Sequence, residues 1–251
     1  MEVIFGFFFN IYFSISVQSM KPFNPILFFT LVLTIFLAYE SKAQFGVRLK
    51  YNSNNYKNWE NVINQRYNTK NTLLSSGYET GVDYWFRLEK KRIEFMPELF
   101  YSQSTTTFNG AEILDKMNAT AIGFNFHTQI YALDLGNDCN CPTFSKSGSG
   151  IDKGLFFHFT PGLMYHTTTP TFDPIISMSI EPYKKLIFRA GIGAGIDFGV
   201  NDLLTITPMI SYYFSSAMNW ESYLQSSTNL SQLQFTLRLG FRPDYGRGRR
   251  R

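Results

Sequence analysis

Cysteine is nearly absent from this sequence of 251 residues, which contains only Cys139 and Cys141. Two cysteines separated by a single residue cannot form a disulfide framework, so packing or lipid must hold the fold together. A bond between them would close a small, strained ring that is easily reduced. We therefore interpret the pair as a loop staple or as two inert thiols.

Charged residues are also scarce, at 17% of the chain, and the net charge of +4 is mild. Much of that charge lies in a basic C-terminal tail, residues 243–251. A charge of this size and position does not favour a protein that coats nucleic acid, so we expect no nucleic-acid partner.

Helical patterns of any length are missing as well. After residue 43, apolar and polar residues alternate with a period of two, which is typical of β-strands. The chain is rich in the aromatic residues that strands favour, with 26 Phe and 15 Tyr. The sequence therefore predicts an all-β domain over residues 44–242.

An export signal precedes this domain. Residues 20–43 begin with the basic Lys21, continue with an apolar run at 26–38 and end with small residues at the two positions that a signal peptidase inspects. The run is shorter than the roughly 20 residues of a spanning helix. Residues 1–19 have neither a basic flank nor a cleavage pattern, so we expect translation to start at Met20 and residues 1–19 to be an extension that is not translated. A genuine second apolar segment is the alternative.

Eight segments of the domain show the alternation, and most are separated in turn by short turns and long polar loops. They are residues 44–51, 77–89, 93–104, 119–132, 154–166, 186–199, 203–214 and 233–241. Strands separated in turn by short turns and long loops are typical of a closed barrel that crosses an outer membrane. The sequence predicts an eight-stranded antiparallel up-and-down transmembrane β-barrel. The alternative is a ten-stranded barrel with an added strand at 175–182.

The stretch "GYETGVDYWFRLE", residues 77–89, indicates which side of the sheet faces inward. Its apolar side carries Tyr, Val, Phe and Leu, and its other side carries Gly, Trp and charged residues. In a narrow membrane barrel the apolar side faces lipid, and the mixed side fills a lumen with room only for side chains. A soluble lipocalin-like barrel would have the reverse arrangement.

The lengths of the connections predict which end of the barrel faces the periplasm. Short turns near residues 90 and 201 are expected there, whereas the connection at 135–153 is an irregularity because it is long on the same side. The connections expected outside the cell follow Tyr51, Phe108, His166 and Phe214.

Charged residues on the inner side of the strands are balanced in sign. They are Arg48, Lys50, Arg87, Arg189, Arg238 and Arg242 with Glu79, Asp83, Glu89, Glu94, Glu98 and Asp197. A lone buried charge is costly, so a balanced set predicts ion pairs that fill the tube. An open pore would carry a ring of one sign. Water-filled rims are the alternative position for Lys50, Glu89 and Arg242, and the other nine form the predicted lumen charge network.

The exported part, from residue 44 to about residue 242, resembles the small eight-stranded outer-membrane β-barrel proteins of Gram-negative bacteria, the OmpA/OmpX and PorT-like type. The alternating strands, the glycine-rich segment at 189–214 and the terminal strand at 233–241 carry this resemblance. It implies residence in the outer membrane and insertion by the barrel-insertion machinery, which reads a terminal aromatic residue such as Phe241. It does not imply catalysis.

Histidines and serines offer two other kinds of site. His127 and His158 point inward on successive strands, but no Cys or carboxylate has ligand spacing to them, so we expect neither metal nor cofactor. A barrel enzyme that acts on lipid or peptide would use residues near the outer rim. The candidates are His166, Asp173, Ser215 and Ser216. No motif joins them, so an enzyme is the second alternative.

The preferred interpretation is a monomeric, non-enzymatic protein of the outer membrane with a structural or surface-binding role. Its expected partners are outer-membrane lipid, the insertion machinery and a surface ligand bound by the extracellular loops. A narrow solute channel is the first alternative.

Overall fold

The computed structural model describes residues 44–67, 69–88, 93–108, 113–131, 154–173, 180–200 and 204–241. Several expectations lie outside these residues. They are the extension, the signal peptide, the basic tail, the two cysteines, the long connection at 135–153, and the side chains of Arg87, Glu89 and Arg242.

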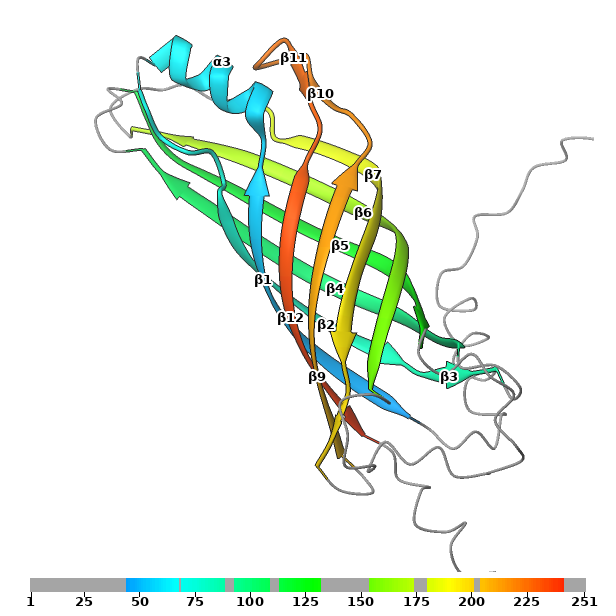
Figure 1. Ribbon diagram of the computed structural model, residues 1–251. Helices are drawn as coiled ribbons and strands as arrows, with labels where there is room; N and C mark the ends of the chain where they lie inside the picture. Colours follow the sequence, from blue (N-terminus) through cyan, green and yellow to red (C-terminus); the bar gives the residue numbers. More distant parts are fainter. Residues whose placement is uncertain are drawn as a thin grey trace, which may run out of the picture. The chain divides into compact units, whose positions relative to one another are not determined.

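Eight antiparallel strands form a closed ring (Figure 1). They are β1 (Phe45–Asn55), β2 (Ser76–Tyr84), β4 (Ile93–Thr107), β5 (Leu114–Ile130), β6 (Leu155–Phe172), β7 (Tyr183–Ile196), β9 (Leu204–Ser215) and β12 (Ser231–Phe241). β3 (Phe86–Arg87) continues β2, and β8 (Phe198–Gly199) continues β7. The ring closes because β12 pairs with β9 on one side and with β1 on the other.

The ten-stranded alternative is wrong. β6 pairs directly with β7 from Leu155 opposite Ile196 to Thr168 opposite Tyr183, which leaves no place between them for another strand. Of the segment 175–182, residues 175–179 lie outside the part that the structure describes.

The apolar side of the sheet faces outward, as the sequence predicts. Along β1, Phe45 and Leu49 are 54% and 52% exposed, whereas Arg48 between them is fully buried. The same alternation of exposed apolar and buried polar residues runs along β2 and β12. A closed hydrogen-bonded ladder with an apolar exterior is the form in which β-strands cross a membrane, because no backbone polar group is left bare in hydrocarbon.

Aromatic side chains mark both edges of the apolar exterior. We name the end of the barrel that carries α3 (Lys57–Tyr67) the loop rim, and the opposite end, where β1 begins and β12 ends, the turn rim. The outward tyrosines toward the loop rim are Tyr51, Tyr78, Tyr101, Tyr165 and Tyr212. A chain of ring contacts toward the turn rim joins Phe45, Tyr84, Phe86, Phe95 and Phe126. Aromatic girdles of this kind sit at the two interfaces of a membrane.

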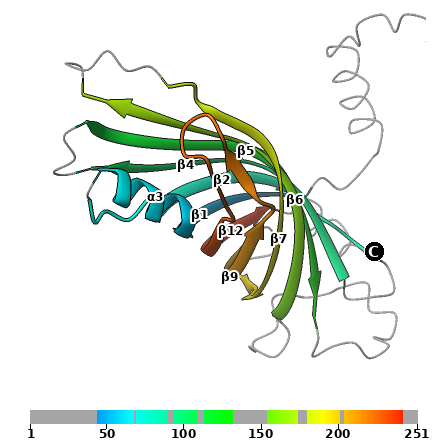
Figure 2. The ribbon, with the colours of Figure 1, turned by 90° about the horizontal axis from the view of Figure 1, so that it is seen from above.

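The expectation that no helix follows residue 43 is wrong. α3 occupies the polar stretch after β1, and β10 (Met218–Trp220) pairs with β11 (Ser226–Thr228) in the connection before β12. Seen from above (Figure 2), α3 and the orange β10–β11 segment lie across the end of the barrel. We name these two segments, residues 56–75 and 216–230, the cap. Only Trp59 and Ile63 of α3 are buried, so its apolar stripe is too narrow to stand out in the sequence.

In the part of the chain that the structure describes, α-helices are too short or too polar to cross a membrane.

A positive charge on the apolar exterior should destabilise the barrel. Leu49 lies between Phe45 and Tyr51 on the outward side of β1, so we expect Leu49→Arg to lower the free energy of unfolding by about 2–4 kcal/mol, the cost of an arginine near the bilayer midplane. Asn55→Arg, at the end of the same strand, should cost close to nothing. Denaturant titration of the folded chain in phospholipid vesicles measures both. Equal losses for the two variants would contradict the outward apolar side.

Candidate functional site

The interior of the barrel is filled by buried polar and charged side chains. Seven of them form the central group, which we name the ion network. Its members are Arg48, Lys50, Glu79, Asp83, Glu98, Arg189 and Arg238. Each is at most 4% exposed. Buried charges are stable only when each contacts a partner of opposite sign, so every member of the ion network is expected to pair with another member.

Asp83 joins three strands. Arg48 of β1 and Arg238 of β12 lie directly opposite each other in register, an arrangement that is unfavourable for two like charges. The carboxylate of Asp83, on β2, accepts a hydrogen bond of 2.6 Å from Nε of Arg48 and two bonds, of 2.6 and 2.8 Å, from the guanidinium of Arg238. One carboxylate therefore compensates both arginines across the seam at which the ring closes.

Glu79 and Glu98 compensate the other two cations. The Nζ atom of Lys50 lies 2.6 Å from Glu79 and 2.6 Å from Glu98. Arg189, which reaches across the lumen from β7, donates two hydrogen bonds of 2.9 and 3.1 Å to Glu79. Its guanidinium also lies 3.9 Å from the ring centre of Phe100. The alternative position of Lys50 at a water-filled rim is wrong, since its amine lies 2.6 Å from each of these carboxylates.

Glycines on the inner side of the strands make room for this network. Gly46 and Gly240 face each other in register, next to the pair formed by Arg48 and Arg238. A Cβ atom on Gly46 would lie only 2.6 Å from the guanidinium of Arg238, and one on Gly240 would lie 2.5 Å from it. The two glycines therefore leave the space through which Arg238 reaches Asp83.

Two further carboxylates lie closer to the turn rim. Glu94 accepts a hydrogen bond of 2.6 Å from the indole of Trp85, and it lies 3.0 Å from the phenol oxygen of Tyr131. The same phenol lies 2.5 Å from Asp197, which also accepts a bond from Thr207. Tyr131 thus connects Glu94 of β4 with Asp197, which lies between β7 and β8.

A chain of hydrogen bonds leads from the ion network into the opposite wall. Glu98 lies 2.8 Å from Nε2 of His127, and Nδ1 of His127 lies 2.9 Å from the hydroxyl of Thr160. The same hydroxyl lies 3.0 Å from Nδ1 of His158, and Nε2 of His158 lies 3.0 Å from the hydroxyl of Ser211. We name these five residues the histidine chain. Glu98 is an acceptor only, so His127 donates from Nε2 and accepts from Thr160 at Nδ1. With neutral rings, His158 then donates from Nδ1 to Thr160 and accepts a hydrogen bond from the hydroxyl of Ser211 at Nε2.

The structure places eight of the nine predicted lumen charges in two groups. Arg48, Glu79, Asp83, Glu98, Arg189 and Arg238 lie in the ion network, and Glu94 and Asp197 share Tyr131. Arg87 lies opposite Glu94 in register.

Amide side chains extend the polar interior toward the loop rim, and the sequence analysis missed them. Gln234 donates a hydrogen bond of 2.8 Å to Asn52, and Gln232 donates one of 2.9 Å to Asn54. Their alternation with outward residues on β1 and β12 was the signal that could have placed them inside.

The cap closes the lumen at the loop rim. The indole of Trp59 donates a hydrogen bond of 3.1 Å to the carbonyl of Ser226, and Arg66 donates one of 2.6 Å to the carbonyl of Tyr223. Trp59 packs against Tyr183 and Trp220, at 5.2 and 5.6 Å between ring centres. Burial raises the pKa of the Tyr223 phenol well above its usual value, so this hydroxyl stays neutral within the cap.

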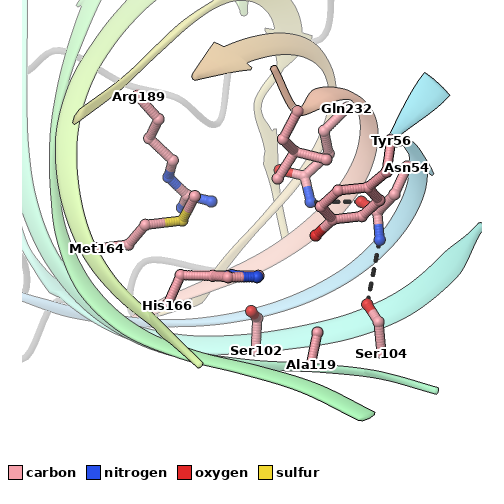
Figure 3. A pocket seen from close by; sticks show the side chains of 10 residues that line it. Asn54, Tyr56, Ser102, Ser104, Ala119, Met164, His166, Arg189 and Gln232 are labelled. Atoms are coloured by element: carbon pink, nitrogen blue, oxygen red, sulfur yellow. Dashed lines mark hydrogen bonds between the residues drawn. The ribbon is translucent and has the colours of Figure 1, made fainter. Parts of the chain in front are cut away.

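Little space remains between the ion network and the cap (Figure 3). The cavity there is about the size of one water molecule. His166 and Met164 lie on one side of it, and Asn54, Tyr56 and Gln232 lie on the other.

The residues proposed for an enzyme are engaged separately. His166 is buried and bonds to Thr168 at 2.9 Å, whereas the hydroxyl of Ser215 donates to the carbonyl of Ser216 and accepts the backbone amide of Leu230. Asp173 follows the end of β6, where its backbone amide bonds to Ile113. Within the residues that the structure describes, no group of three or more His, Cys, Asp or Glu side chains could hold a metal ion.

Comparison with known proteins gives likenesses of shape. No protein-family model and no curated protein matches the sequence. Among solved structures, Neisserial surface protein A has a TM-score of 0.44 at 10% identity, over 80% of this chain and 97% of that one. The attachment invasion locus protein Ail of Yersinia pestis, in complex with the heparin analogue sucrose octasulfate, has a TM-score of 0.43 at 11% identity, over 80% of this chain and 99% of that one. The outer membrane enzyme PagL has a TM-score of 0.37 at 11% identity, over 77% of this chain and 97% of that one.

The closed ring of eight strands, its apolar exterior with two aromatic girdles and its filled polar interior define the class of the protein. It is a small transmembrane β-barrel of the outer-membrane type, with the architecture of the OmpA/OmpX-like barrels. Barrels of this kind lie in the outer membrane of Gram-negative bacteria, and this is the location of the chain.

Removing the charge of Asp83 should be costly. Asp83→Asn leaves Arg238 without its carboxylate partner and Arg48 with only Glu98, at 4.0 Å, so we expect a loss of about 3–5 kcal/mol in the free energy of unfolding. Asp115→Asn, at an exposed position on β5, removes the same charge and should change stability little. Denaturant titration in vesicles compares the two, and a small loss for Asp83→Asn would contradict its bridging position.

Thr160→Val should interrupt the histidine chain without changing the shape of the side chain. Nδ1 of His127 and Nδ1 of His158 then lose their shared partner, at a cost of about 1–3 kcal/mol. Nitrogen NMR of labelled histidines should show the Nε2–H form of His127 and the Nδ1–H form of His158 in the unaltered chain and a mixture in the variant. Thr128→Val, at a partly exposed position on the outward side of β5, is the control. Identical spectra for all three proteins would contradict the assignment.

Proposed function

We propose that this outer-membrane barrel is a non-conducting, non-enzymatic protein that displays a folded cap at the cell surface. The observation that carries the proposal is that the lumen is closed twice, by the ion network and by the cap. The loop rim is proposed to face outward, because small barrels of this class carry short periplasmic turns and long extracellular loops. The turn-rim connections from β3 to β4 and from β8 to β9 are short, and the connection from β5 to β6 is the exception.

The ion network supports a non-conducting lumen. Arg189 reaches from β7 to Glu79 on β2, and Lys50 joins β1 to β2 and β4, so the ion pairs span the interior from wall to wall. Its four cations are matched with three carboxylates at close range and leave no ring of one sign. An ion that passed through would have to break these pairs in a water-poor interior.

The cap supports a surface-binding role because its two connections hold each other in place. α3 contacts β11 through side-chain to backbone hydrogen bonds from Asn58 and Trp59. Tyr67 and Tyr223 add a bond of 2.7 Å between their hydroxyls. A rigid loop surface binds a partner with less loss of conformational entropy than a flexible one. The exposed residues of α3 are Lys57, Asn58, Asn61, Gln65 and Arg66, which offer amide and cationic groups to a surface ligand.

The remaining parts of the proposal follow from closure and export. A closed ring has no edge strand, so the barrel is proposed to exist as a monomer. Residues 20–43 are proposed to direct export and residues 1–19 to be an extension. The barrel-insertion machinery is proposed to recognise the last strand, which ends at the aromatic Phe241.

Planar-bilayer recording tests the non-conducting lumen. We expect no unitary current steps from the purified full-length chain, and none from Trp59→Ala, because loosening the cap leaves the ion network in place. Hydrogen exchange should show α3 protected in the unaltered chain and at least tenfold less protected in Trp59→Ala. Stable unitary steps from the unaltered chain would establish the channel alternative, and an unprotected α3 would remove the case for a rigid cap.

A further inference from the structure

One flank of the barrel continues past the tyrosine girdle as a sheet with a polar outer side. β4, β5 and β6 extend to Thr107, Leu114 and Phe172, so the last two have 17 and 18 residues. Tyr101, Ile122 and Tyr165 lie side by side in register at the edge of the lipid-facing exterior. Three further outward rows follow them. The rows are Gln103, Thr120, Thr167 and Lys184, then Thr105, Asn118 and Thr169, then Thr107, Lys116 and Thr171. We name these ten residues the threonine face.

The composition of the threonine face is unlike that of the exterior next to it. Six of its ten residues are threonine, two are amides and two are lysines, and none is acidic or large and apolar. All ten are exposed or partly exposed. Cross-strand spacing places the hydroxyls about 4.8 Å apart across the strands and about 7 Å apart along them. The result is a regular array of hydrogen-bonding groups about 10 Å by 14 Å in extent.

The cap occupies the opposite side of the same strand segments. Met117 and Phe172 point inward from β5 and β6 and belong to one buried cluster with Trp59 and Trp220 of the cap. The inner side of the flank is therefore filled. Its outer side continues the lipid-facing surface directly, strand by strand, toward the loop rim.

We propose that the threonine face binds the phosphorylated saccharide headgroup of an outer-leaflet glycolipid. The face begins one row beyond Tyr101 and Tyr165, which mark the membrane interface, so its rows stand at the depth of the headgroups and sugars of the adjoining lipid. This continuity with the lipid surface favours a lipid-borne partner over a soluble polysaccharide. The inference rests on the outward orientation of the loop rim in the proposed function, but not on a closed lumen.

The chemistry of the face fits such a headgroup. Threonine hydroxyls both donate and accept hydrogen bonds, and the amides of Gln103 and Asn118 do the same, as sugar hydroxyls require. Thr105 donates to Asn118 at 2.9 Å, which orients the amide within the array. Lys184 stands at the end of the first row and Lys116 in the middle of the third, where their ammonium groups can pair with phosphates. None of the ten residues is acidic, and the exposed Asp115 precedes Lys116 at the register shift in β5.

Binding of rough-form lipopolysaccharide to the full-length chain in nanodiscs tests this inference. Two variants remove the array in different ways. The first is Thr105→Val with Thr169→Val and Thr171→Val, and the second is Lys116→Gln with Lys184→Gln. We expect each to weaken binding about tenfold, which corresponds to about 1.4 kcal/mol. Thr→Val keeps a β-branched side chain, so the strands should persist, and heat-modifiable gel mobility verifies that each variant is folded.

The matched controls carry the same changes elsewhere. Thr72→Val with Thr80→Val and Thr128→Val, and Lys90→Gln with Lys91→Gln in the connection between β3 and β4, should leave the affinity within twofold. Equal binding by all variants would overturn the inference. So would equally tight binding of phosphatidylglycerol, which would show a general attraction to anionic lipid, or equally tight binding of the lipid-free core saccharide, which would show a soluble partner. Current steps in the bilayer recording would contradict the non-conducting lumen but not glycolipid binding by the threonine face. A failure of the proposed function can therefore be told apart from a failure of this inference.

Discussion

The structure depends on closure of one hydrogen-bonded ladder. Strands can cross hydrocarbon only if every backbone donor and acceptor is satisfied within the sheet, and here the last strand satisfies this requirement by pairing with both β9 and β1. Closure with eight strands fixes the circumference and hence a lumen only as wide as side chains. The interior must then be filled as completely as a protein core, although its walls alternate polar with apolar residues.

The narrow lumen explains why glycine, arginine and aromatic residues occur together on the inner side. A large side chain fits only where the facing position has none. The guanidinium of Arg238 therefore lies over Gly46 and Gly240, and the rings of Tyr213 and Phe100 lie beside Gly191 and Gly123. Each cation of the ion network is in turn paired with a carboxylate on a neighbouring or facing strand. Volume and charge are thus balanced at the same positions.

The period-two pattern of the sequence predicts most of the barrel, because one residue in two must face lipid along every strand. It predicts the eight strands and the inward positions of Arg48, Asp83 and Arg189. It does not predict partners, since Arg189 meets Glu79 across the lumen through tertiary geometry alone. The cap was missed for a related reason. The tertiary contacts of Trp59 and Ile63 stabilise α3, whose own sequence is polar and weakly patterned.

The ion network has a further consequence for folding to a single register. A buried ion pair is weak evidence for stability, because desolvation offsets much of its attraction. Its value here lies in what a misaligned strand would cost. A slip of β1 by one residue would turn Arg48 and Lys50 toward lipid, at about 2–4 kcal/mol each. Together these costs are comparable with the roughly 5–15 kcal/mol by which a whole domain is stable. Buried charges that add little to the stability of the native barrel can therefore exclude barrels in which a strand has slipped by one residue. The alternation of inward polar and outward apolar residues thus specifies the strand register of the closed ring.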